Sequence, residues 1–108
     1  MTRFSVITIT YNAEAVLQRT LDSVLQQTYE GVEHIIIDGA STDRTLQMAE
    51  DYKAANDNGQ SPKPHKVIIH SEPDQGIYDA MNKGLTQASG DYVLIMNAGD
   101  FFPKDDTL

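Results

Sequence analysis

The sequence predicts an α/β domain built on an open, Rossmann-like parallel sheet with flanking helices, and three observations support this fold class. Four short runs rich in valine and isoleucine are almost continuously apolar, as strands buried on both faces are. Segments with helical periodicity lie between these runs. Successive strand ends are about thirty residues apart, the usual length of a β-α-β crossover. Right-handed crossovers then arrange the strands as a doubly wound sheet.

The first predicted elements follow from the apolar pattern. Strands are expected at residues 4–10, 34–37, 67–69 and 92–96, with a polar loop over residues 57–66. After the first strand, apolar or small residues recur at helical spacing, at Leu17, Leu21, Val24, Leu25 and Thr28. That period predicts an amphipathic helix of about four turns.

Two further helices are predicted from their caps and their periodicity. Three residues that favour the N-cap position precede the second helix, namely Ser41, Thr42 and Asp43. Its expected inward-facing residues are Leu46, Ala49 and Tyr52. The third helix is expected to end at Ser89-Gly90. It carries its apolar residues on one side, at Ile77, Met81, Leu85 and Ala88.

Composition excludes several classes of partner. The chain has 108 residues and a net charge of −8, with sixteen acidic and eight basic residues. A duplex nucleic acid or a polybasic contact with a membrane requires the opposite sign, so an anionic ligand needs a helix N-terminus or a metal cation. No apolar run approaches the ~20 residues of a transmembrane helix. The absence of cysteine fits a reducing compartment, and we expect a cytoplasmic protein.

Polar clusters follow all four predicted strands, at residues 10–12, 38–43, 71–76 and 97–100. Ligands of open α/β sheets bind beyond the carboxyl ends of the strands. Each cluster alone is explained equally well by a helix cap or a turn. Capping does not, however, require Tyr11, Asp38 and Asp100 at these places. The four clusters together therefore predict a site for a polar ligand.

Sequence motifs that identify other classes of α/β protein are missing from this chain. It has no glycine-rich dinucleotide turn after the first strand, no P-loop and no nucleophile elbow. The three histidines, His34, His65 and His70, have no metal-ligand spacing. We expect His34 and His70, which flank strands, to be packed or at the rim of the sheet.

Asp100 is the candidate metal ligand. A carboxylate at the end of a strand can hold Mg²⁺ or Mn²⁺ while a diphosphate supplies the other oxygens. Such a cation stabilises a diphosphate leaving group. The alternative is that Asp100 only caps the next segment.

Five stretches in a fixed order carry a resemblance to a known family. They lie at residues 5–12, 21–29, 36–45, 74–84 and 88–100. In this order they resemble family 2 glycosyltransferases of the GT-A fold, from about residue 4 to residue 102. The resemblance implies a nucleoside diphosphate sugar donor, with UDP or another nucleotide, a divalent metal, and a glycan or lipid-linked hydroxyl acceptor. It also suggests a role in polysaccharide biosynthesis.

The resemblance also implies roles for individual residues. It assigns binding of the nucleoside to Thr10, Tyr11 and Asp38, and binding of the metal to Asp100. Tyr11 offers a face for stacking, and Asp38 could accept from a base N–H or a ribose hydroxyl. Because Asp38 ends its strand, we expect it to lie outside the core. The full set of expected nucleotide-sugar contacts is Thr10, Tyr11, Asn12, Asp38, Asp74, Gln75, Asp79 and Gly99.

The sequence departs from the family at two positions and in its length. Many members have a second acid where Gly39 stands, and an acid where Gly99 stands. The family's catalytic region is longer than this chain, so we expect residues 1–108 to be its N-terminal nucleotide-sugar-binding part, apparently truncated.

The catalytic base is therefore unassigned. After the metal motif only Asp105 and Asp106 are acidic, in a polar tail that we expect to be mobile. The last strand is expected to be exposed enough for self-association. A non-catalytic nucleotide-binding or structural module is the alternative function, and turnover of a donor distinguishes the two.

Overall fold

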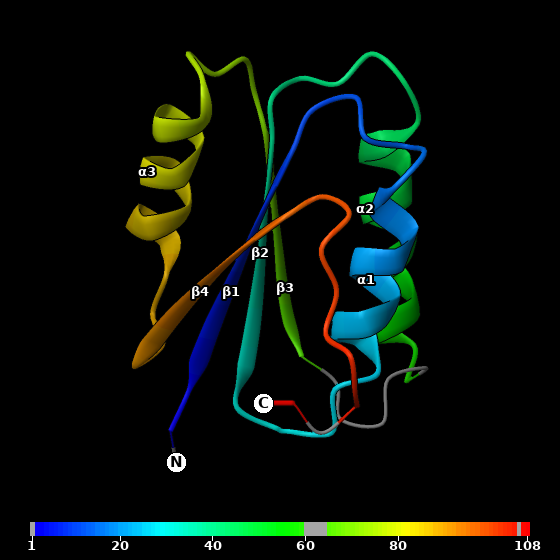
Figure 1. Ribbon diagram of the computed structural model, residues 1–108, viewed down its shortest axis with the longest axis vertical. Coiled ribbons are helices and arrows are strands. Elements are labelled where there is room, and N and C mark those ends of the chain that lie inside the picture. The colour runs from blue at the N-terminus through cyan, green and yellow to red at the C-terminus, as the bar shows by residue number, and fades with distance from the viewer. Residues whose placement is uncertain (1, 60–64, 106) are drawn as a thin grey trace.

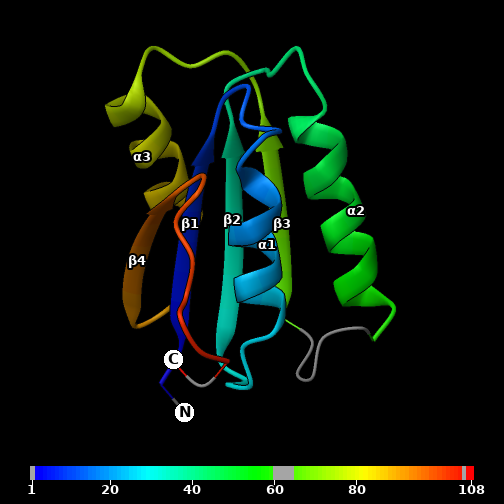
Figure 2. The same ribbon diagram turned by 45° about the vertical axis from the view of Figure 1, so that its right-hand side comes forward.

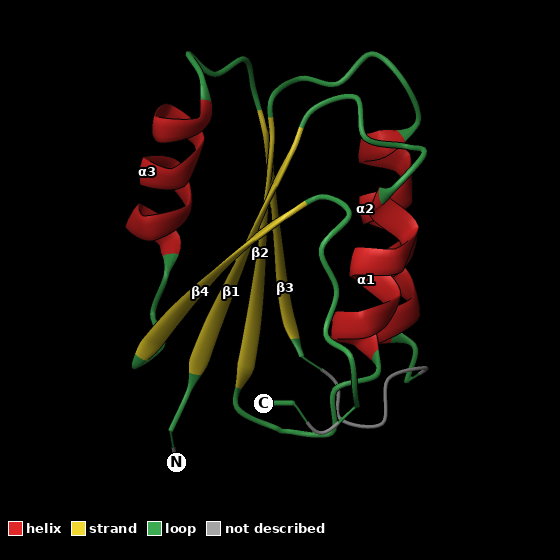
Figure 3. Ribbon diagram, viewed as in Figure 1, coloured by secondary structure: helices red, strands yellow, loops and turns green. Residues whose placement is uncertain are grey.

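The computed structural model describes residues 2–59, 65–105, 107 and 108, and it confirms the predicted fold class. One parallel sheet has the strand order β3-β2-β1-β4, and Figure 3 shows its strands flanked by helices. In the described residues the elements are β1 (Phe4–Thr10), α1 (Leu17–Leu25), β2 (Val32–Asp38), α2 (Thr45–Asp57), β3 (Lys66–Ser71), α3 (Ile77–Gln87) and β4 (Tyr92–Asn97). Residues 60–64 of the predicted polar loop lie outside the described part.

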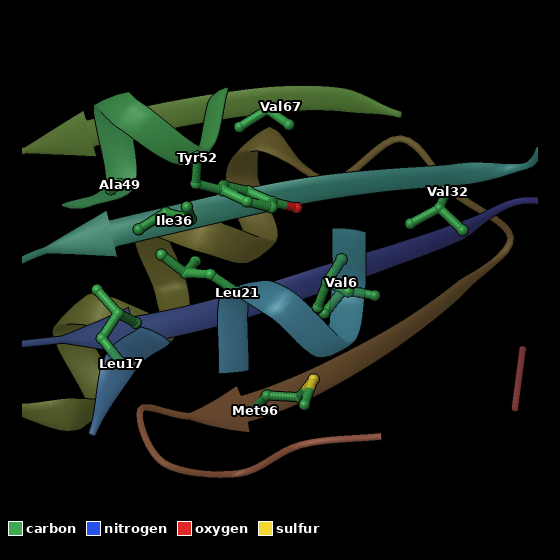
Figure 4. Packing of buried hydrophobic residues seen from close by; sticks show 10 residues of the cluster. Val6, Leu17, Leu21, Val32, Ile36, Ala49, Tyr52, Val67 and Met96 are labelled. Atoms are coloured by element: carbon green, nitrogen blue, oxygen red, sulfur yellow. The ribbon is translucent and has the colours of Figure 1, made fainter. Parts of the chain in front are cut away.

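The helices form a layer on each face of the sheet. Helices α1 and α2 cover one face and α3 covers the other, as the two views in Figures 1 and 2 show. The larger part of the core lies under α1 and α2, where Leu21, Ile36 and Met96 pack together (Figure 4). A smaller cluster lies under α3 and centres on Ile7 and Ile35. This double cover explains why β2 is buried along its whole length and why its sequence does not alternate.

Helix α1 is shorter than the predicted four turns, because tertiary contacts end it at Leu25. The Thr28 N–H donates to the Asp105 carbonyl, 2.8 Å away. The buried side chain of Gln27 donates to the Lys104 carbonyl and accepts from the Leu108 N–H. These bonds hold the segment after β4 along α1. These contacts anchor the described residues of the tail, whose mobility stays a prediction, while Asp106 lies outside the described residues.

Helix α3 packs on the sheet through a different face from the one its large apolar residues suggested. Ala80 and Gly84 are its buried residues, whereas Ile77 and Leu85 are 51% and 46% exposed. A Cβ on Gly84 would lie 2.6 Å from Ile7 Cγ2. Small residues therefore bring the helix close to the sheet, and its large residues are left outside. In α2, by contrast, Ala49 and Tyr52 are buried as predicted, and Leu46 is half-buried.

His34 is packed and His70 is partly exposed, within the packed or rim positions predicted for these two residues. His34 lies inside β2 without any exposed surface, and its ring nitrogens pair with Thr8 Oγ1 and the Tyr52 hydroxyl, both at 2.7 Å. Burial, followed by the nearby His65, lowers the pKa of His34 to about 3. His65 is also buried, and His70 Nε2 lies 3.1 Å from Glu72 Oε1.

Strand β4 is an edge of the sheet, because it pairs with β1 alone among the described strands. Tyr92, Val93 and Ile95 are 61%, 39% and 39% exposed. Self-association through this edge stays a prediction. In the described part of the chain, none of the helices has the length and apolar character needed to cross a bilayer.

Candidate functional site

The carboxyl ends of the strands lie toward the top of Figure 1. Thr10, Asp38 and Ser71 are neighbours in register across β1, β2 and β3. The pairing continues one step further, because the Gly39 N–H donates to the Thr10 carbonyl and the Glu72 N–H to the Asp38 carbonyl, both at 3.0 Å. The loops that follow the strands therefore start side by side. We call residues 10–14, 38–43, 71–76 and 97–101 the carboxyl edge.

Asp38 holds three parts of this edge together. Oδ1 accepts from the Thr10 hydroxyl at 2.9 Å and from the Ser41 hydroxyl. Oδ2 accepts from the Ser41 N–H at 3.0 Å and the Ser71 hydroxyl at 2.8 Å. The residue is 1% exposed, so the expectation that it lies outside the core is wrong. Its contact with a nucleoside stays a prediction, as does that of the equally buried Thr10.

Asn12 ties the loop after β1 to the loop after β2. Its backbone has a φ of 46°, a left-handed conformation that asparagine tolerates better than most residues. The Asn12 N–H donates to Ser41 Oγ at 2.9 Å, and Asn12 Oδ1 accepts from the Thr42 N–H at 2.8 Å. These bonds give Asn12 an architectural part in the carboxyl edge.

The N-cap residue of α2 is Arg44 rather than one of the three predicted candidates, and Asp43, directly before it, binds the first residue of the helix. Asp43 Oδ1 accepts from the hydroxyl and the N–H of Thr45, and Asp43 Oδ2 accepts from the Glu14 N–H at 3.2 Å. The hydrogen bond from the Thr45 hydroxyl is the main cause that lowers the pKa of Asp43. Both oxygens of the Asp43 carboxylate are therefore occupied by hydrogen bonds from nearby residues of the protein.

Tyr11 and Asp74 meet beside Gly39. The Tyr11 side chain is 65% exposed, so its ring is open to a ligand. A Cβ on Gly39 would lie 2.8 Å from Asp74 Oδ2 and 3.4 Å from Tyr11 Cδ1. Asp74 Oδ1 accepts from the Gly76 N–H at 3.3 Å. The edge thus presents an aromatic ring and a carboxylate from two different loops.

Asp79 stabilises the loop between β3 and α3. Its Oδ2 accepts from the Gln75 N–H at 2.9 Å and lies 3.2 Å from Lys83 Nζ. The Gln75 N–H, and then Lys83, lower the pKa of the Asp79 carboxyl. Lys83 also lies 3.1 Å from Glu72 Oε1 and donates to the Pro73 carbonyl. Asp79 therefore has internal partners, whereas the neighbouring Gln75 is exposed.

Asp100 closes a turn at the end of β4 and remains exposed. Its N–H donates to the Asn97 carbonyl at 2.9 Å, and its Oδ2 accepts from the Asn97 N–H at 3.0 Å. Gly99 has a φ of 103°, which side-chain-bearing residues rarely adopt. The Asp100 Oδ1 atom has no hydrogen bond within the described residues. It is therefore available to a ligand.

Two residues of α1 that the sequence analysis did not assign hold this turn. Arg19 Nε donates to the Gly99 carbonyl at 2.9 Å, and its guanidinium carbon lies 4.7 Å from the centre of the Phe101 ring. The Thr20 hydroxyl accepts from the Gly99 N–H at 2.8 Å. Nothing local in the sequence indicates these contacts, which join residues about eighty positions apart.

The donor set at Asp100 suits a weakly held divalent cation. Within the described residues, no group of three or more histidine, cysteine or acidic side chains could enclose a metal ion. Mg²⁺ is commonly held by one or two carboxylates plus the phosphates of a substrate. A single free carboxylate oxygen fits a cation that arrives with a diphosphate.

A hollow among the described residues lies apart from the predicted ligand contacts. A hollow of about 300 Å³ exists between α1 and α2, where Gln18 and Asp51 are among its lining residues. It includes none of the predicted ligand contacts. Those contacts therefore belong to the carboxyl edge and not to this hollow.

These features define an open parallel α/β domain with exposed recognition groups at the carboxyl ends of its strands, where such domains bind nucleotides. Glycosyl transferase family 2 matches residues 5–108, and the chain belongs to that family. The match covers the carboxyl edge and every predicted site residue.

Curated relatives extend well beyond this chain. A PGL/p-HBAD biosynthesis glycosyltransferase of Mycobacterium bovis is 42% identical over 105 residues, which cover 97% of this chain and 38% of the relative. An uncharacterized glycosyltransferase of Mycobacterium tuberculosis is 40% identical over 105 residues, covering 96% of this chain and 36% of the relative. The chain thus spans little more than a third of the length of these relatives.

Solved structures share the fold. The mannosyltransferase PcManGT from Pyrobaculum calidifontis, in complex with GDP-Man and Mn²⁺, matches with a TM-score of 0.82 and 28% identity. The match covers 97% of this chain and 30% of that one. S. aureus TarS in complex with UDP-GlcNAc matches with a TM-score of 0.73 and 32% identity, over 93% of this chain and 27% of that one. These matches identify the domain as GT-A-like.

Proposed function

We propose that residues 1–108 form the N-terminal donor-binding part of a glycosyltransferase and hold a nucleoside diphosphate sugar at the carboxyl edge. One observation carries the proposal. In a chain of family 2, an exposed aromatic ring and two carboxylates with free oxygens, those of Tyr11, Asp74 and Asp100, project from three loops at the same edge. The complexes of GT-A-like structures with GDP-Man and UDP-GlcNAc support the choice of ligand class.

The residues of the edge divide into two roles under this proposal. Tyr11 stacks on the base, because its ring is exposed. Thr10, Asn12 and Asp38 shape the nucleoside site through their mutual hydrogen bonds. Along the donor sugar and phosphates lie Gln75 and the backbone of Gly99, with Asp79 holding the Gln75 segment.

A divalent cation, Mn²⁺ or Mg²⁺, completes the donor site in this proposal, with Asp100 as its protein ligand. When bound, the cation neutralises the diphosphate and stabilises it as a leaving group. The net charge of −8 favours such a cation, because the cation offsets the repulsion between the acidic protein and the phosphates. Asp100 Oδ1 is free to bind, and the Mn²⁺ in the PcManGT complex supports the choice of ion.

Transfer of the sugar to a hydroxyl of a glycan or of a lipid-linked acceptor is the activity we propose for the whole protein. The glycosyltransferase named for PGL/p-HBAD biosynthesis supports the reaction class through its 42% identity. The donors named for two solved structures differ, GDP-Man in one and UDP-GlcNAc in the other, so the donor site is the part to test with this chain.

Nucleotide binding should depend on metal. We expect UDP or GDP to bind in the presence of Mn²⁺ and far more weakly in EDTA, as measured by calorimetry. Asp100→Asn should weaken binding in Mn²⁺ by roughly 10-fold or more, because an interaction with a charged group is worth about 1.5–3 kcal/mol. Asp105→Asn, an exposed carboxylate in the same segment, is the matched control. Equal affinity with Mn²⁺ and EDTA would remove the cation from the site, and the absence of any nucleotide binding would refute the donor site.

A further inference from the structure

We propose that Asp74 reads the nucleobase. Its carboxylate accepts a hydrogen bond from the imino N–H of uracil or guanine while Tyr11 stacks on the ring, and Gly39 provides the space for both. The inference rests on the proposed donor site and deepens it, because it assigns base selection to a residue of the loop between β3 and α3.

The geometry around Gly39 carries the argument. The atoms Asp74 Oδ2 and Tyr11 Cδ1 both lie within 3.4 Å of the point that a Cβ on Gly39 would occupy. Gly39 is not among the residues with positive φ, so its backbone would accept any side chain. Space, rather than conformation, is therefore what the absent side chain provides. The carboxylate fills that space beside the exposed ring.

Asp74 also has a free acceptor, unlike Asp38 at the end of β2. Its Oδ1 accepts from Gly76, but its Oδ2 has no hydrogen bond within the described residues. Both oxygens of Asp38 are occupied, and Asp79 is held by Gln75 and Lys83. A charged oxygen beside an exposed ring therefore remains for a ligand.

The chemistry of a carboxylate selects among bases. An ionised carboxylate only accepts hydrogen bonds, so it pairs with the N3–H of uracil or the N1–H of guanine. At the equivalent ring position, cytosine N3 and adenine N1 carry a lone pair instead of a hydrogen, and the carboxylate repels that lone pair. Rejection of the wrong partner by an unmatched polar group is an effective source of specificity. The site should therefore prefer nucleotides with an imino N–H.

Calorimetry with UDP, GDP, CDP and ADP in Mn²⁺ tests this assignment. In the wild-type chain we expect UDP or GDP to bind roughly 10- to 100-fold more tightly than CDP and ADP, the scale of one hydrogen bond to a charged group. Asp74→Ala should abolish most of that preference. Asp74→Asn should raise the affinity for CDP relative to UDP, because an amide can donate to N3 and accept from the amino group of cytosine. Glu50→Gln, which removes a charge from an exposed position of α2, should leave the preference intact.

Gly39→Ala tests the same idea without removing the carboxylate. Its Cβ would displace Asp74 Oδ2, the end of a flexible side chain, so the fold should persist while base preference falls. The double variant Gly39→Ala/Asp74→Ala should lose no more preference than Asp74→Ala alone, since both changes act on one interaction. Thermal melting of each variant verifies that it folds.

The outcomes separate this inference from the proposed function. Base preference that is unchanged in Asp74→Ala and in Asp74→Asn overturns the role of Asp74 while leaving the donor site in place. Equal binding of all four nucleotides by the wild-type chain also overturns it. If none of the four binds, the proposed donor site fails and this inference fails with it.

Discussion

Asp38 and Asp100 are the same residue type at the ends of two strands, yet their surroundings differ. Asp38 is buried and accepts four hydrogen bonds from Thr10, Ser41 and Ser71. Asp100 is exposed and accepts one, from its own turn. At the scale of single residues, then, one carboxylate maintains the shape of the carboxyl edge and the other is free to bind a ligand.

Asp38→Ala should lower the free energy of unfolding by roughly 2–4 kcal/mol, because it leaves several buried donors without an acceptor. Asp38→Asn should cost less, since its oxygen can still accept from the Ser41 N–H. Asp100→Ala is the matched change at an exposed strand end and should cost no more than about 1 kcal/mol. Urea unfolding measures all three, and equal losses for Asp38→Ala and Asp100→Ala would contradict the internal role of Asp38.

Helix α3 shows how small residues set the position of a whole element. Ala80 and Gly84 face the sheet, and Gly84 lies directly against Ile7. The loop that precedes this helix brings Asp74 next to Gly39 at the carboxyl edge. The same helix thus packs on the sheet through small residues and follows directly on a loop of the proposed site.

Gly84→Ala should destabilise the protein even though alanine favours helices. The gain in helix propensity is about 1 kcal/mol, but the new methyl group would overlap Ile7, and overpacking costs about 1–3 kcal/mol. We expect a net loss of about 1 kcal/mol in urea unfolding. Asn82→Ala, at an exposed position of the same helix, should instead be neutral or stabilising. In an Ile7→Ala background the penalty should disappear, and its persistence there would show that the close contact is not its cause.

At the scale of the whole molecule, buried polar groups connect the layers. His34 of β2 joins Thr8 of β1 to Tyr52 of α2. On the other face, Glu33 accepts from Ser5 of β1 and from Ser89 in the connection to β4. Burial opposes the charge on Glu33, but the hydrogen bonds from Ser89 and Ser5 outweigh it and lower its pKa. These groups make stability depend on pH.

The free energy of unfolding should fall as the pH drops from about 6.5 toward 3. Burial lowers the pKa of His34 to about 3, whereas an unfolded histidine titrates near ~6.5, so the unfolded state binds more protons in this interval. Between pH 7 and pH 5 the loss attributable to His34 is about 2 kcal/mol. His34→Gln should reduce the pH dependence by that amount, with His65 and His70 unchanged in both proteins. An identical slope in urea unfolding at several pH values would mean that His34 is not protonated on unfolding.

Much of the site could be predicted because it depends on strand ends. Buried strands are recognisable from continuous valine and isoleucine, and a parallel sheet brings the residues after them to one edge. This is why the pattern of residues alone places Tyr11, Asp38 and Asp100 at the same edge. The hydrogen bond between Asp43 and Thr45 is likewise local, because the two residues are two positions apart.

The sequence by itself thus determined the fold class, the sheet edge at which the site forms and the chemical groups available there. Only the tertiary structure decided that α1 ends at Leu25, that α3 packs through Ala80 and Gly84, and that Asp38 is buried. The physical reason is the same in each case. Helix ends, packed faces and free hydrogen-bonding atoms are set by partners distant in the chain, such as Asp105 for Thr28, and local periodicity carries no information about those partners.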